Sequence, residues 1–199
     1  MKMILPIFIL GLLCSSSALA TAPVDEMVAE TLSSAPADNR CNLSVGSTTI
    51  DYGDLSHWQL QDVPGNAGNV TPGKRTLNLS VTCPYSQPMT LQLRAERASS
   101  GDARYGARGS VSLQLLNAQL DGKSVQLMML PQDGALSGPV SSVLLLQPGQ
   151  GVAAVENGQL IQGRVFNLQL DIEPILSISD VRTGSRETSE ANLTLELVE

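Results

Sequence analysis

Apolar and polar residues alternate along most of this chain from residue 42 onward. Alternation at every second position is typical of a β-strand with one buried face, because successive side chains of a strand point to opposite sides. No window after residue 42 keeps the apolar spacing of a helix. The clearest alternating runs are TLNLSVTC (76–83), MTLQLRA (89–95), SVSLQLLNAQL (110–120), KSVQLMML (123–130), SSVLLL (141–146) and RVFNLQLDI (164–172).

Turn-forming residues separate these runs. Asp121-Gly122 and Asn157-Gly158 are dipeptides that favour two-residue hairpin turns, and Pro148-Gly149 marks a further turn. The first of these predicts a hairpin between the runs 110–120 and 123–130, with Val125, Leu127 and Met129 alternating on the return strand. Many short strands with frequent turns predict an all-β fold, an antiparallel sandwich or barrel.

The last ten residues, EANLTLELVE, form one more alternating run. Leu193, Leu195 and Leu197 occupy every second position up to the C-terminus. Chain ends usually fray, so a well-patterned strand at the terminus must be paired with another strand. The pattern leaves open whether that partner belongs to the same chain.

The N-terminus predicts export. Lys2 precedes an apolar run at residues 3–13, and Ala18-Leu19-Ala20 is a typical cleavage site. These features indicate a secretory signal peptide at 1–20, too short to span a bilayer. Cys14 could suggest a lipoprotein, but Leu13 before it is bulkier than a lipid-modification site favours.

Residues 21–40 differ in composition from the strand-rich region after them. They contain few large apolar residues and prolines near both ends, which predicts an extension outside the core, followed by one domain at 41–199. The chain has 12 basic and 19 acidic residues and a net charge of −7. Nucleic acid and anionic membranes require clustered cations, so neither is expected as a partner.

The cysteine count predicts one disulfide. Cys14 leaves with the signal peptide, so Cys41 and Cys83 remain, and two cysteines of an exported chain most often pair. The pairing also makes neither of them a nucleophile.

Residues for catalysis are few. His57, beside Trp58, is the only histidine, so it has no second histidine for a metal site or triad and is expected at the surface. Asp51 and Asp54 could form a carboxylate pair or a calcium loop, but turn chemistry around Gly53 is the more common role for aspartates in such a segment. The segment QPGQG lacks the lysine and helix of a phosphate loop. We therefore expect no enzyme activity, catalytic residue, metal site or cofactor.

Several of these features together resemble the pilin subunits of bacterial chaperone–usher fimbriae. They are the signal peptide and extension, CNLSVGSTTIDYGDL from Cys41, LNLSVTC ending at Cys83, the Asp-Gly hairpin of NAQLDGKSVQL and the alternating C-terminal run. The resemblance covers residues 41–199 and is nearest to minor or poorly characterised subunits. It implies an Ig-like antiparallel sandwich with one disulfide that lacks its final strand.

The resemblance also implies partners and a location. Leu193, Leu195 and Leu197 would border the groove left by the missing strand and contact a periplasmic fimbrial chaperone that lends a strand to it. At the outer-membrane usher, the N-terminal extension of a neighbouring pilin subunit would replace that strand. The protein would pass through the periplasm to a cell-surface fimbrium and contribute to adhesion.

The donor segment of this chain would be residues 21–40. Val24, Val28 and Leu32 fall on one strand face, although Glu26 and Glu30 lie between them and the spacing also suits a helical turn. If the segment donates nothing, the subunit would sit at a fibre terminus or not polymerise. Val198 stands where many pilins carry a tyrosine.

A second hypothesis is a self-complete exported β-sandwich that binds a protein or a carbohydrate. Sugar sites usually offer aromatic side chains to stack on the sugar ring. The chain has one Trp, three Tyr and two Phe, one of them in the predicted signal peptide, so the composition gives a sugar site little support.

Overall fold

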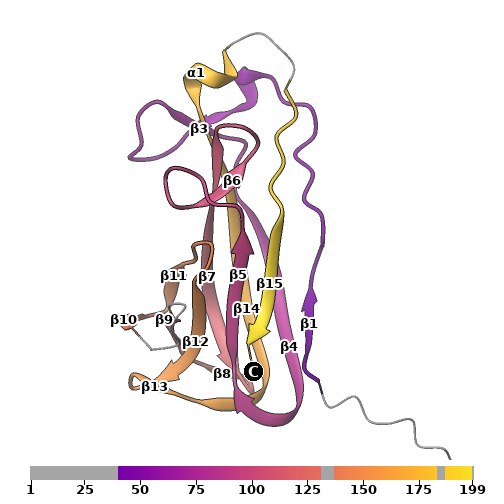
Figure 1. Ribbon diagram of the computed structural model, residues 1–199, viewed down its shortest axis with the longest axis vertical. Helices are drawn as coiled ribbons and strands as arrows, with labels where there is room; N and C mark the ends of the chain where they lie inside the picture. Colours follow the sequence, from indigo (N-terminus) through magenta and orange to yellow (C-terminus); the bar gives the residue numbers. More distant parts are fainter. Residues whose placement is uncertain (1–39, 131–136, 183–186, 199) are drawn as a thin grey trace, which may run out of the picture. The chain divides into compact units, whose positions relative to one another are not determined.

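The computed structural model describes residues 40–130, 137–182 and 187–198 (Figure 1). The predicted signal peptide and all of the donor segment except Arg40, including Val24, Val28 and Leu32, lie outside the described residues. The elements are β1 (Asn42–Val45), η1 (His57–Gln59), β2 (Gln61–Asp62), β3 (Asn69–Thr71), β4 (Arg75–Pro88), β5 (Thr90–Ala95), β6 (Ala103–Tyr105), β7 (Gly109–Leu120), β8 (Lys123–Ser124), β9 (Gln126–Leu130), β10 (Ser137–Ser141), β11 (Val143–Leu145), β12 (Gly151–Glu156), β13 (Gln159–Leu160), β14 (Gln162–Ser177), α1 (Ile178–Val181) and β15 (Leu193–Val198).

The strands form two antiparallel sheets. In the first sheet, β14 lies between β4 and β7, β1 pairs with β4, β11, β6 and β8 pair with β7, and β3 and β2 continue from the end of β14. In the second sheet the order is β10, β9, β12, β5 and β15, with β13 on β12. These two sheets confirm the predicted all-β sandwich.

The core lies between the sheets and is built from the alternating positions. On β4 and β14, Val81 is opposite Phe166 and Leu79 is opposite Leu168, and all four side chains are buried. On the second sheet, Met89, Leu91 and Leu93 are buried in the same cluster. Period-2 patterning produces this arrangement because each strand turns one face to the other sheet.

The disulfide joins the first strand to the core. Cys41 and Cys83 are bonded, with their Cα atoms 4.2 Å apart, so β1 is covalently held to β4 as the cysteine count predicts. At its C-terminal end β4 leads directly into β5 of the second sheet, and Met89 is fully buried at this crossing.

The predicted hairpin turns are present. Asp121 and Gly122 have φ of 50° and 79°, and Asn157 and Gly158 have φ of 53° and 77°, the positive values that a type I′ turn requires. The Asp121 carboxylate also accepts hydrogen bonds from the backbone N–H groups of Val165 (2.9 Å) and Arg164 (3.0 Å). These two hydrogen bonds lower the pKa of Asp121 below its ordinary value.

The return strand of the first hairpin differs from the prediction. Only Lys123 and Ser124, which form β8, pair with β7. The chain then crosses to the second sheet, where β9 pairs with β12. The predicted alternation of Val125, Leu127 and Met129 is confirmed, because Leu127 is buried in the core and Val125 and Met129 pack against it half-buried. Met128, at 8% exposed, is covered as well but does not belong to this core cluster. What the prediction missed is the change of sheet, because alternation shows which face of a strand is buried but not which strand pairs with it.

Helical structure is minor. The described residues contain one short 3-10 helix, η1, and one short α-helix, α1. No helix in the described ranges has the length and apolar character needed to cross a membrane.

Candidate functional site

The C-terminal strand β15 pairs with a strand of its own chain. Leu193, Leu195 and Leu197 lie opposite Ala95, Leu93 and Leu91 of β5, without a shift in register. Across the described ranges, β15 has no pairing partner along its other edge. The partner that the sequence analysis left open is therefore β5, on one side only.

Burial differs sharply between these two paired strands. Side chains directly opposite each other in an antiparallel pair point to the same face, so Leu195 and Leu93 both face the core. Leu91 and Leu93 are 0% and 1% exposed, whereas Leu195 and Leu197 are only half-buried. The core is therefore covered at β5 and incompletely covered one strand further out.

The same mismatch occurs at the edge of the first sheet. Leu43 and Val45 of β1 lie opposite Val81 and Leu79 of β4. Val81 and Leu79 are buried, but Leu43 and Val45 are half-buried and pack against the core from its rim. In the described part of the chain, β1 pairs only with β4.

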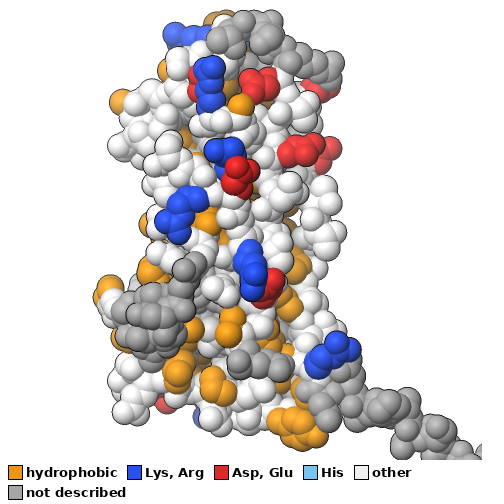
Figure 2. Space-filling view, viewed as in Figure 1, with side chains coloured by type: hydrophobic (Ala, Val, Ile, Leu, Met, Phe, Trp, Pro, Cys, Tyr) orange, Lys and Arg blue, Asp and Glu red, His pale blue; other side chains and the backbone are white. Residues whose placement is uncertain are grey.

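These two edges border the same side of the sandwich. In Figure 1, β15 (yellow) and β1 (indigo) lie on the same side of the molecule, with part of β4 drawn between them. Figure 2 shows hydrophobic side chains along the boundary between them. No backbone pairing joins β1 to β15 within the described residues. We call the five half-buried residues of this boundary the open edge: Leu43, Val45, Leu193, Leu195 and Leu197.

The charges of β15 lie away from the core. Glu196 forms an ion pair with Arg94 of β5 at 2.5 Å, on the outer face of the second sheet. Basic and acidic side chains are interspersed on this face in Figure 2. The inward positions of the open edge are all leucine or valine, so an apolar strand could cover them without burying a charge.

The alternative candidate residues have structural roles. Asp51 Oδ1 accepts a hydrogen bond from the backbone N–H of Gly53 at 2.7 Å, as the turn interpretation predicts. The rings of His57 and Trp58 contact each other with centroids 4.0 Å apart and planes tilted by 39°, and Trp58 is 84% exposed. No group of three potential metal ligands occurs in residues 40–130, 137–182 and 187–198.

Sequence reasoning identified one half of the open edge and missed the other. It named Leu193, Leu195 and Leu197, which the structure places together on β15, and did not name Leu43 or Val45. The available signal was the short alternation in CNLSVG, which gains weight only once the disulfide places β1 at the edge of the first sheet.

Comparisons with known proteins find likeness only among solved structures. No protein-family model and no curated protein matches this chain. Seven solved chains match, among them the crystal structure of the P pilus rod subunit PapA. That chain is 14% identical, with a TM-score of 0.34, and the alignment covers 79% of this chain and 99% of PapA.

Proposed function

We propose that this protein is a non-catalytic structural subunit of a chaperone–usher fimbrium, assembled by donation of a β-strand from another chain. The observation that carries the proposal is the open edge, whose five inward-facing side chains are half-buried, four of them opposite fully buried residues of the neighbouring strands. The order of motifs described in the sequence analysis gives independent support.

A strand added from another chain would extend the second sheet at β15 and cover the partly exposed apolar edge of the first sheet at β1. Running along β15, it would hydrogen-bond to the free backbone edge, and its inward side chains would cover Leu193, Leu195 and Leu197. The same strand would cover Leu43 and Val45 from the other side. Finishing the burial of five half-buried aliphatic side chains would contribute on the order of 5 kcal/mol. A whole domain is typically stable by about 5–15 kcal/mol, so a subunit without the added strand would be only marginally stable.

Two chains would supply this strand in turn. In the periplasm a fimbrial chaperone would lend it, and at the outer-membrane usher the extension of a neighbouring subunit would replace it. The corresponding segment of this chain is 21–40, with Val24, Val28 and Leu32 as its apolar residues. The assembled subunit would lie in a cell-surface fimbrium and contribute to adhesion.

Thermal unfolding with an added peptide tests the proposal. The chain is produced from Asn39 onward and heated with and without excess peptide of residues 21–40. A rise in Tm of many degrees is expected, because covering the open edge adds burial to the folded state only. The matched control is the same peptide with Val24, Val28 and Leu32 replaced by serine, which should give little or no rise.

The other outcomes separate the parts of the proposal. A shortened chain that is as stable as the exported chain and ignores both peptides would contradict an open edge. A shortened chain that is soluble only with a fimbrial chaperone and ignores the peptide would retain the open edge but remove the donor role of residues 21–40. The subunit would then belong at the end of a fibre.

A further inference from the structure

The outer face of the first sheet contains a hollow of about 890 Å³. Its floor belongs to β1, β4, β14 and β7, and its rim includes Val143 of β11. Asn78 and Ser80 alternate along β4 with the buried Leu79, so their side chains point away from the core. The hollow is therefore on the opposite face from the leucines of the open edge. The polar residues of its lining are Ser44, Asn78, Ser80, Asn117, Gln119, Ser124, Ser142, Asn167 and Gln169.

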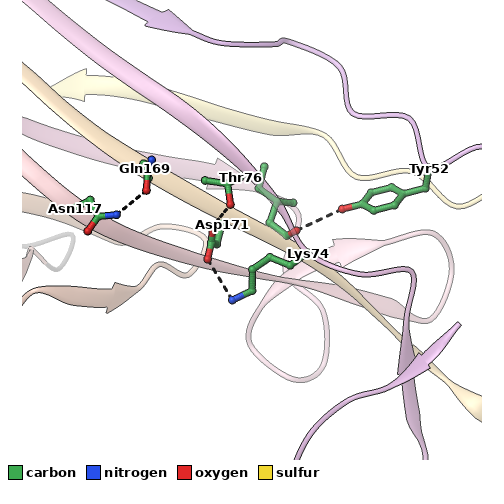
Figure 3. A network of polar contacts seen from close by, with 7 residues as sticks. Tyr52, Lys74, Thr76, Asn117, Gln169 and Asp171 are labelled. Carbon is green, nitrogen blue, oxygen red and sulfur yellow. Dashed lines mark hydrogen bonds and ion pairs between the residues drawn. The ribbon is translucent and has the colours of Figure 1, made fainter.

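Some of these side chains form two hydrogen-bonded rows across the strands. In the first row, Ser80 Oγ donates to Asn167 Oδ1 at 2.7 Å. In the second row, Asn117 Nδ2 donates to Gln169 Oε1 at 2.6 Å, a contact that Figure 3 shows. Gln169 Nε2 in turn donates to Asn78 Oδ1 at 3.2 Å. Each amide carries two N–H donors and two acceptor lone pairs, so the rows hold the amides in place and leave hydrogen-bonding capacity for a ligand.

A β-bulge aims Asn117 at this face. Along β7, Leu113 and Leu115 face the core, and strict alternation would direct residue 117 there too. Instead the register shifts opposite β14, Asn117 has φ of 53° and is exposed, and core-facing positions resume at Ala118. Among the described non-glycine residues, it is the one positive φ within a strand rather than in a hairpin turn. Bulges that turn a side chain out of the alternation are frequent beside functional sites.

The chemistry of the lining selects a class of ligand. None of its residues is ionisable, and the nearby carboxylate of Asp171 is held by Lys74 at 3.2 Å and by Thr76 at 2.5 Å (Figure 3). A neutral lining offers no charge to attract phosphates or metal ions. It also lacks the Trp, Tyr, Arg and Met that are enriched in protein interfaces.

We propose that this hollow binds a neutral oligosaccharide. Side-chain amides both donate to and accept from sugar hydroxyl groups, and Leu116 and Val143, the latter 43% exposed, offer apolar surface to the C–H groups of a sugar ring. The site uses amides and aliphatic side chains where sugar sites more often use aromatic rings, so we expect weak binding, in the millimolar range. This inference does not depend on strand donation.

NMR titration of the exported full-length chain tests the inference. The probes are glucose hexasaccharides with α-1,4, β-1,4 and β-1,3 linkages and a mannohexaose, with 3′-sialyllactose as the charged comparison. At least one neutral probe should shift the side-chain NH2 signals of Asn117 and Gln169 in a saturable way. Shifts with sialyllactose alone, or no saturable shift up to tens of millimolar, would overturn the inference.

Variants locate the binding. Asn117→Gly removes the amide while glycine keeps the positive φ, and it should weaken binding by about fivefold or more, the loss expected for one or two hydrogen bonds. Gln169→Thr removes a second amide from a different strand and should do the same. Gln114→Ala changes an amide of β7 outside the hollow and should leave binding unchanged. Backbone spectra confirm that each variant is folded. Equal binding by Asn117→Gly and Gln169→Thr would place the sugar elsewhere and overturn the inference.

Discussion

The second sheet ends in two edge strands, β10 and β15, that differ in the features that decide whether an edge can accept another strand. β10 contains Gly138, with φ of 88°, followed by Pro139, and it pairs with β9 at two positions with a register shift between them. β15 is paired with β5 at six successive positions without a shift and contains neither glycine nor proline. Irregular edges with proline prevent strand addition, whereas straight edges permit it.

This difference shows that edge protection in this fold is local. The chain supplies a bulged, proline-containing edge on one side of the second sheet and a regular one on the other. The regular edge is also the one whose inward leucines are half-buried. The ability of β15 to accept another strand therefore comes from its own residues rather than from the sandwich as a whole.

The largest effect is expected from removing the covalent link on the open side. Replacing both Cys41 and Cys83 by serine should lower the free energy of unfolding by about 4 kcal/mol, because the disulfide closes a loop with a sequence separation of 42. It should also free β1, which otherwise pairs only through its four-residue ladder with β4. Urea unfolding at equilibrium measures the loss. A loss below about 1 kcal/mol would mean that β1 is held well enough without the bond.

A charge on the open edge should have the next largest effect. Leu195→Asp places a carboxylate among the half-buried leucines and should destabilise the domain by about 2–4 kcal/mol. It should also abolish the rise in Tm caused by the peptide of residues 21–40. The control is Val140→Asp on β10, also half-buried, for which we expect a change within about 1 kcal/mol and an undiminished peptide response. Equal effects of the two variants would remove the distinction between the edges.

The smallest effect concerns the hairpin turn at Asp121, which belongs to neither edge strand. The pKa of Asp121 is lowered in the folded state, so its carboxylate stabilises the fold above the unfolded-state pKa, and this contribution is lost as the pH falls through the folded-state value. Asp121→Asn should therefore lower Tm modestly at neutral pH, with the difference from the unchanged protein vanishing on acidification. Tm measured between about pH 7 and about pH 2 tests this. A difference that is constant with pH would assign the effect to turn geometry.

The sequence predicted the strands well where alternation was long and interrupted by clear turns. TLNLSVTC and RVFNLQLDI direct the expected side chains into the core, where all but the half-buried Leu77 are buried, and the two Asx-Gly turns have the required positive φ. The disulfide followed from counting. Strands and turns of this kind depend on neighbouring residues, and two cysteines can form only one disulfide.

Features that depend on distant partners were not predictable in the same way. The alternation of β15 indicated a strand but not that β5 would cover one side and leave the other free. The crossing of the chain from β8 to β9 depends on which sheet can bury the apolar side chains of residues 126–130. The bulge at Asn117 did leave a signal, since the apolar phase of LQLLNAQL slips by one residue between Leu115 and Ala118, but only pairing with β14 makes the slip a bulge.

The position of the disulfide has a mechanical consequence. The chain enters the described domain at Arg40, and the next residue, Cys41, is bonded to Cys83 near the middle of β4. A pulling force applied through the preceding residues therefore passes directly into β4, which is hydrogen-bonded to β14 over most of its length. Tension on the N-terminal segment cannot peel β1 away from its edge. In a fibre of the proposed kind, each subunit would bear load through the centre of its first sheet rather than through its most exposed strand.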